Sequence, residues 1–258
     1  REEILESFYD EGTPDNAFDV HNPAFRDFIV DLIVDVEERY PVDGINLDHI
    51  RAMGICASEA CNKDYERRFA RRLALDRHAW RVSAVAADNI AAWNGSAVRD
   101  IVMRVHEGIA QIKPELPLTV DAHPLHEGLL LQGQDSVAWA NDGLIDRIFD
   151  MDYKTRPDFH TIMRVANKLN DPRKLTVLFS TYETTGDGRT PRDPVLLDAY
   201  IEISRRVLPG AGAAFYHRKD ISPVQIAALK QTAYRDSAVP RCVLGSLLKP
   251  DRLGLVCE

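Results

Sequence analysis

Four aspartates stand at the ends of three short apolar stretches, where their carboxylates could serve as acids, bases or nucleophiles. Asp48 follows the apolar part of "VDGINLDHI", Asp121 lies in "LPLTVDAH", and Asp150 and Asp152 lie in "RIFDMDY". Residues two apart in a strand project to the same side, so Asp150 and Asp152 should point together. Glycoside hydrolysis needs two carboxylates, one as acid on the leaving oxygen and one as nucleophile or base. The spacing therefore favours that chemistry.

Other polar and aromatic residues accompany these carboxylates and follow two later apolar stretches. Asn46 precedes Asp48 by two residues and His123 follows Asp121 by two, so each should share a side with its carboxylate. Tyrosine rings at such ends could stack on the faces of sugar rings. The residues expected to line a substrate site are Asn46, His49, Arg51, His123, Asp150, Asp152, Tyr153, Tyr182, Tyr216 and His217.

A metal-dependent hydrolase of the amidohydrolase type is an alternative interpretation of overlapping residues. Its ligands would come from Asp121, His123, His126, His160 and His217, since imidazole and carboxylate are common metal ligands. Barrels of that type take paired histidines from their first strand, and no such pair is present. The sequence also lacks the glycine-rich motifs that bind nucleotides and the GxSxG motif of serine hydrolases. We therefore expect neither a metal nor a cofactor.

Four cysteines occur as two local pairs, Cys56 with Cys61 and Cys242 with Cys257. Two short-range disulfides would suit an exported protein. Four free, partly buried thiols are the alternative, and the spacing is poor for a zinc site.

Apolar stretches that resemble strands alternate with amphipathic stretches that resemble helices. Such alternation predicts a parallel sheet and an α/β fold, whose sites lie at the carboxyl ends of the strands. Residues 1–20 are polar and indicate an arm or loop, and residues 21–258 form one domain. The expected strands lie near 42–50, 116–123, 147–153, 174–182 and 211–219, and the principal helices near 23–40, 80–112, 157–170, 194–210 and 222–236.

Composition excludes several classes of partner. The chain has 258 residues and a net charge of −8, which argues against nucleic acid or an anionic membrane surface because both attract cationic proteins. No apolar run is long enough to cross a bilayer. A (β/α)8 barrel has eight strands, whereas only five are recognisable here. Because the sequence also opens on Arg1 rather than Met, we expect the first strands to lie upstream of it.

The first apolar strand and the helix before it match a known pattern. "NPAFRDFIVDLIVDVEERYPVDGINLDHIR" resembles the glycosyl hydrolase-like 10 group of TIM barrels, whose pattern continues from a helix into Y-x-V-D-G-I-x-[FL]-D-x-I-R. "WANDGLIDRIFDMDY" is similar to a second motif of the group, although Asp150 stands where that motif has Pro. "GAGAAFYHRK" is similar to its last strand. The resemblance spans residues 20 to 220.

The resemblance implies a (β/α)8 fold in which "DGINLD" is the fourth strand, with strands one to three upstream. It also implies an exported, carbohydrate-active protein that cleaves bacterial or extracellular polysaccharide, located outside the cell or in the envelope. The family's catalytic aspartate falls on Asp48, and Asp121 matches the second acid of related barrels by position. A polysaccharide-binding barrel without catalytic activity, in an envelope or export complex, is the alternative from another functional class.

Overall fold

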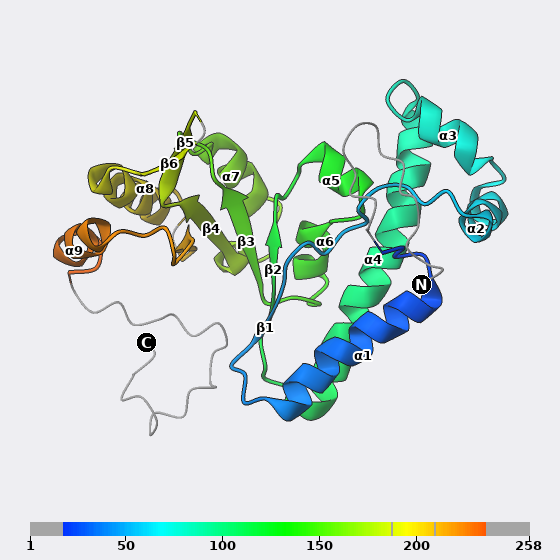
Figure 1. Cartoon of the computed structure of the whole chain (residues 1–258), viewed down its shortest axis with the longest axis horizontal. Coiled ribbons are helices and arrows are strands. Elements are labelled where there is room, and N and C mark those ends of the chain that lie inside the picture. Colours follow the sequence, from blue (N-terminus) through cyan, green and yellow to red (C-terminus); the bar gives the residue numbers. More distant parts are fainter. Residues whose placement is uncertain (1–17, 187, 209, 236–258) are drawn as a thin grey trace. The chain divides into compact units, whose positions relative to one another are not determined.

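The computed structural model describes residues 18–186, 188–208 and 210–235 (Figure 1). Cys242, Cys257 and most of the expected arm 1–20 therefore lie outside the described residues. The chain folds as two compact units, residues 1–116 with 124–139 and residues 117–123 with 140–258. They are called unit 1 and unit 2 below, and each is described by itself.

Unit 1 is built mainly of helices, joined by one short strand. Each helix that was expected here begins at a polar cap; for example, the Asn22 side chain accepts a hydrogen bond from the Ala24 N–H, with Pro23 in the first turn,. Its elements are α1 (Pro23–Arg39), β1 (Ile45–Leu47), α2 (Glu59–Phe69), α3 (Leu73–Ala79), α4 (Ala84–Ile112), α5 (Glu127–Leu131) and, at the boundary with unit 2, α6 (Ser136–Asn141).

Helices α1 and α4 pack closely along their lengths. A Cβ atom on Gly108 would lie 2.6 Å from the Val34 side chain, so only glycine permits this approach,. Arg26 Nε donates to Asp100 Oδ2 at 2.8 Å across the same contact. These contacts fix the helix that leads directly into β1 and Asp48.

The segment after β1, in which no helix was expected, forms the two helices α2 and α3. The Ser58 side chain caps α2 by accepting the Cys61 N–H,. Tyr65 and Cys61 are buried on one side of that helix, in a cluster that also contains Trp93 of α4. Burial of this apolar face compensates for a sequence whose overall polarity indicated a loop.

Unit 2 has a parallel sheet in the order β2-β3-β4-β7. The strands are β2 (Leu118–Ala122), β3 (Arg147–Asp152), β4 (Leu175–Ser180) and β7 (Gly212–Tyr216), and the helices are α7 (Phe159–Ala166), the 3-10 turn η1 (Pro172–Lys174), α8 (Pro194–Val207) and α9 (Pro223–Gln231). An antiparallel hairpin, β5 (Tyr182–Thr185) with β6 (Gly188–Pro191), follows β4 and was not anticipated. The last helix begins at a polar cap, because Ser222 and Gln225 form a capping box,.

Five strands, β1, β2, β3, β4 and β7, are thus each followed by at least one helix, as the sequence predicted. In the described part of the chain no helix has the length and apolar character needed to cross a membrane.

Candidate functional site

Register in the sheet of unit 2 determines which side chains share a face. Asp121 lies opposite Phe149, and Ala122 lies opposite Asp150. Residues paired across neighbouring strands project to the same side, and successive residues alternate. Asp121 and Asp150 therefore lie on opposite faces of the sheet, although both are near carboxyl ends.

Helices α7, α8 and α9 cover one of these faces, called the helix-covered face. Phe179 of β4 contacts Phe159 of α7 and Tyr200 of α8, with ring centroids 6.3 and 5.6 Å apart. Phe215 of β7 packs in a cluster with residues of α8 and α9. Asp152 is paired with Phe179 in the register, so Asp150 and Asp152 belong to this face.

The opposite face, called the Asp121 face, carries a carboxylate and a row of aromatic rings at its carboxyl edge. Tyr153 and Tyr216 stack with centroids 4.8 Å apart and an interplanar angle of 29°. His123 meets Tyr153 edge to face at 6.5 Å. Asp121 and His123 alternate with the buried Ala122, so both project to this side,. Three separate strands therefore bring predicted site residues together here.

The hairpin β5–β6 is tied to the loop after β7. Arg189 of β6 lies 4.3 Å from the centre of the Tyr182 ring and donates to Asp220 Oδ2 at 2.8 Å. His217 lies 6.5 Å from the Tyr182 ring and 3.5 Å from Asp220. Two further predicted residues, Tyr182 and His217, are thus neighbours in unit 2.

Arg192 was not among the residues expected to belong to a site. It is 2% exposed, and it donates to the backbone oxygens of Lys154 and Tyr182 at 3.0 and 3.3 Å. Its guanidinium therefore links the segments that follow β3 and β4. An arginine in a hairpin carries no local sequence signal for such a role.

Asp150 and Asp152 lie on the face of the sheet opposite to Asp121, although all three were expected to line one site. Burial, reinforced by the nearby charge of Asp152, raises the pKa of Asp150 to about 7,. Asp152 accepts hydrogen bonds from the backbone N–H groups of Lys154 and Asp158 at 3.3 and 2.7 Å. Its carboxylate therefore holds the turn between β3 and α7.

Asp48 in unit 1 occupies an accessible position after β1. Its side chain is 52% exposed, and its Oδ1 accepts the His49 N–H at 2.7 Å. His49 Nδ1 lies 3.0 Å from the same oxygen, and no Lys or Arg of the described residues forms an ion pair with Asp48. Asn46, two residues earlier, is also exposed. The Asp48 carboxylate is thus accessible, with His49 beside it and the charge of Arg51 nearby.

A cavity of about 500 Å³ adjoins Asp48 within unit 1. The apolar side of α1 forms one wall, and residues of β1 and its end form the other. Burial lowers the pKa of Arg51, while the charge of Asp48 opposes that shift,. The lining includes Phe25, Ile29, Ile33, Val36, Asn46, Leu47, Asp48, His49 and Arg51.

The histidines of the alternative metal site do not gather. Across residues 18–186, 188–208 and 210–235, the one group of three potential ligands within 4.8 Å of one another is Asp19, Cys56 and Cys61. Asp121, His123 and His217 all belong to unit 2 but form no such group there. The cysteine pairing left open by the sequence is decided for one pair, because Cys56 and Cys61 form a disulfide. Asp19, about forty residues from the cysteines in sequence, was not anticipated as their neighbour.

Comparisons with known proteins bear on the family and the fold of the chain. The family model described as Glycosyl hydrolase-like 10 matches residues 8–176, more than half of the chain. No curated protein sequence matches significantly.

Three solved structures show the fold. The glycoside hydrolase domain of PgaB (BpsB) from Bordetella bronchiseptica has 12% identity and a TM-score of 0.65, over 88% of this chain and 68% of its own. The α-L-fucosidase isoenzyme 2 of Paenibacillus thiaminolyticus has 17% identity and a TM-score of 0.56, over 84% of this chain and 30% of its own. A β-galactosidase of Rahnella sp. R3 has 13% identity and a TM-score of 0.50, over 77% of this chain and 34% of its own.

These likenesses confirm the expected fold, an α/β fold of the (β/α)8-barrel type with five recognisable β/α units. The match over residues 8–176 assigns the sequence: the chain belongs to the Glycosyl hydrolase-like 10 family of carbohydrate-active barrels.

Proposed function

We propose that this chain is a glycoside hydrolase that cleaves a bacterial or extracellular polysaccharide. The observation that carries the proposal is the Asp121 face, on which His123 contacts the stacked rings of Tyr153 and Tyr216 at the carboxyl ends of parallel strands and which also carries the Asp121 carboxylate. Strand carboxyl ends are where barrels of this class place their active sites. Flat aromatic surfaces beside a carboxylate suit a sugar ring.

Asp48 and Asp121 are the proposed catalytic pair. Asp48 ends the strand in which the family pattern has its catalytic aspartate, and its accessible side chain has no Lys or Arg ion pair within the described residues. One carboxyl protonates the leaving oxygen, and the other attacks the sugar or activates water. A separation of about 5 Å would retain the anomeric configuration, and one above about 6.5 Å would invert it.

The proposed substrate residues are those on the accessible sides of the two units. In unit 2 they are His123, Tyr153, Tyr182, Tyr216 and His217, and in unit 1 they are Asn46, His49 and Arg51. Asp150 and Asp152 are excluded because they lie on the helix-covered face. The Cys56–Cys61 disulfide supports an oxidising location, outside the cell or in the envelope,.

The direct test is Asp48→Asn with Asp43→Asn as its matched control. Both residues are exposed, and they flank the same short strand at opposite ends. We expect Asp48→Asn to lower glycan turnover at least about 10²-fold with binding retained, as for loss of a catalytic acid or base. Asp43→Asn should turn over at the wild-type rate.

Undiminished turnover in Asp48→Asn would overturn the catalytic assignment. If the wild-type chain binds polysaccharide but releases no reducing ends from any glycan tested, the chain is the polysaccharide-binding barrel instead.

A further inference from the structure

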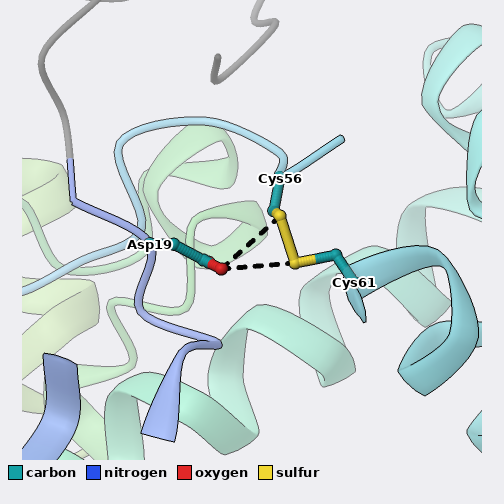
Figure 2. A group of neighbouring side chains, drawn as sticks. All are labelled: Asp19, Cys56 and Cys61. Carbon is teal, nitrogen blue, oxygen red and sulfur yellow. Dashed lines mark hydrogen bonds between the residues drawn. A yellow bond between two sulfur atoms is a disulfide. The ribbon is translucent and has the colours of Figure 1, made fainter. Parts of the chain in front are cut away.

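One side-chain group in unit 1 has no part in the proposed glycan chemistry. Figure 2 shows the Asp19 carboxylate directed at both sulfurs of the Cys56–Cys61 disulfide. Asp19 Oδ2 lies 3.4 Å from Cys61 Sγ and 3.5 Å from Cys56 Sγ. The cysteines are 5% exposed or less, and Asp19 is 9% exposed.

The oxidised sulfurs do not explain this arrangement. A disulfide sulfur has no hydrogen to donate, so neither contact is a hydrogen bond while the S–S bond exists. Asp19 is bonded elsewhere through Oδ1, which accepts the His21 backbone N–H, whereas Oδ2 faces both sulfurs. In the dithiol form two S–H groups could donate to Oδ2, or a cation could lie between two thiolates and the carboxylate.

The distances fit the coordination of zinc. A tetrahedral ion with Zn–S bonds of about 2.3 Å and a Zn–O bond of about 2.0 Å places sulfur and oxygen about 3.5 Å apart. The two observed sulfur–oxygen distances, 3.4 and 3.5 Å, have this length. Only the sulfurs must move apart, which breaking their bond allows.

A helix N-terminus and hydrogen-bond donors lie next to the two cysteines. Cys61 lies in the first turn of α2, where the helix dipole stabilises negative charge,. Cys56 Sγ accepts the Ser58 N–H at 3.4 Å and lies 3.2 Å from the Ser58 hydroxyl. The His21 N–H donates to Asp19 Oδ1 at 2.9 Å, so Oδ2 is held toward the sulfurs.

We propose that Asp19, Cys56 and Cys61 bind Zn²⁺ in the dithiol form of the chain, and that the Cys56–Cys61 disulfide closes this site. The disulfide and the metal are thus alternative ways of joining the same two sulfurs. In the metal form the ion would also bind the segment before α1, through Asp19, to the segment before α2.

Conversion of the disulfide form into the metal-binding form requires a dithiol reductant. The reductant gives two electrons and two protons to the Cys56–Cys61 bond and becomes a disulfide, leaving two thiols in the chain. Zn²⁺ binding then releases the two thiol protons. The site holds two thiolates and one carboxylate, and water completes the tetrahedron.

The test uses the full chain carrying Cys242→Ser and Cys257→Ser, so that every thiolate signal comes from Cys56 and Cys61. The protein is reduced with a phosphine, freed of metal and titrated with Co²⁺, a spectroscopic substitute for Zn²⁺. We expect one ion per chain, with thiolate-to-cobalt charge-transfer absorption and the visible bands of tetrahedral cobalt. Zn²⁺ should displace it, and the oxidised chain should show no such bands.

Asp19→Asn distinguishes a metal ligand from a structural neighbour. We expect it to weaken Co²⁺ binding at least about tenfold, as loss of site residues does in other metal proteins. The matched control Asp27→Asn, an exposed aspartate of α1 paired with Arg104, should bind like the parent.

Circular dichroism monitors folding throughout. A reduced chain that unfolds and regains its helices with Zn²⁺ supports the site. Equal affinity in Asp19→Asn, equal binding by the oxidised chain, or absence of charge-transfer bands would each overturn it. Failure of glycan turnover has no bearing on this result.

Discussion

The two faces of the sheet in unit 2 place their carboxylates in different environments. On the Asp121 face, a partly exposed aspartate lies with aromatic rings, one of which, Tyr216, is 36% exposed. On the helix-covered face, Asp150 and Asp152 are 7% and 6% exposed beneath α7 and its neighbours. Asp121 on one face and Asp150 and Asp152 on the other all lie near the carboxyl ends of their strands. They differ in the face of the sheet to which their positions in the strands direct the side chain.

This difference shows what a strand-end carboxylate does in each environment. Where helices cover the sheet, desolvation raises the pKa of Asp150 to about 7, and Asp152 accepts hydrogen bonds from backbone N–H groups of the next turn,. Neither is offered to a substrate. The other face carries Asp121 on the same side of the sheet as rings that can hold a sugar.

The largest expected contrast between the faces is catalytic. Asp121→Asn should lower glycan turnover at least about 10²-fold, because it removes one of the proposed carboxyl pair. Asp150→Asn, on the opposite face of the adjacent strand, should leave turnover near the wild-type rate. Reducing-end release measured at pH 6 would check both. A larger loss in Asp150→Asn than in Asp121→Asn would contradict the assignment of faces.

The next contrast is the pH dependence of stability. Asp150 has a pKa of about 7 in the folded chain and about 3.8 unfolded, so between these values the folded state holds the extra proton. The free energy of unfolding should therefore fall as pH rises from about 4 to about 7, by up to about 1.4 kcal/mol per unit. Asn resembles the protonated carboxyl in shape and does not titrate.

Asp150→Asn should remove this decline and make the protein more stable than the wild type at pH 8. The measurement is denaturant unfolding of both proteins from pH 4 to 8. A constant difference between them over that range would show that Asp150 titrates normally.

Asp152→Asn tests the second carboxylate of the helix-covered face. It replaces one accepting oxygen with an amide donor, so a backbone hydrogen bond at Lys154 or Asp158 is lost, at a cost of about 1–3 kcal/mol,. Because the Asp152 charge helps to raise the pKa of Asp150, the decline in stability should also shift to lower pH. An unshifted decline would show that the two groups do not interact.

The sequence allowed the alternation of strands and helices to be predicted, because apolar periods and caps such as Asn22 and Ser222 are local signals,. The pairing of Asp150 with Asp152 on one side was also correct, since it depends only on strand geometry. Helices α2 and α3 were missed because their few buried residues, such as Tyr65, gain their stability from α4.

Which carboxylates share a surface could not be predicted in the same way. Side chains alternate within each strand, but the register between β2 and β3 depends on tertiary pairing,. A shift of one residue would have put Asp121 and Asp150 on one face. Asp19 beside the cysteines likewise depends on a contact between distant segments.

The smallest expected contrast concerns two tyrosines, one on each face. Tyr216 stacks on Tyr153 on the Asp121 face, whereas Tyr200 packs on Phe179 and donates its hydroxyl to the Thr155 oxygen at 2.7 Å. Tyr216→Ala should raise KM for glycan about 2- to 12-fold, from the 0.5–1.5 kcal/mol of an aromatic contact. Its effect on stability should be slight, because the ring is partly exposed.

Tyr200→Phe should lower stability and leave KM for glycan unchanged. It removes a hydrogen bond beneath the helices, which lowers stability by about 1 kcal/mol and leaves the Thr155 oxygen without that donor, while KM stays unchanged,. Initial rates and denaturant midpoints of both variants measure the two effects separately. If Tyr200→Phe raised KM as much as Tyr216→Ala, substrate binding would not distinguish the faces, and the sugar site would have to lie elsewhere than on the Asp121 face.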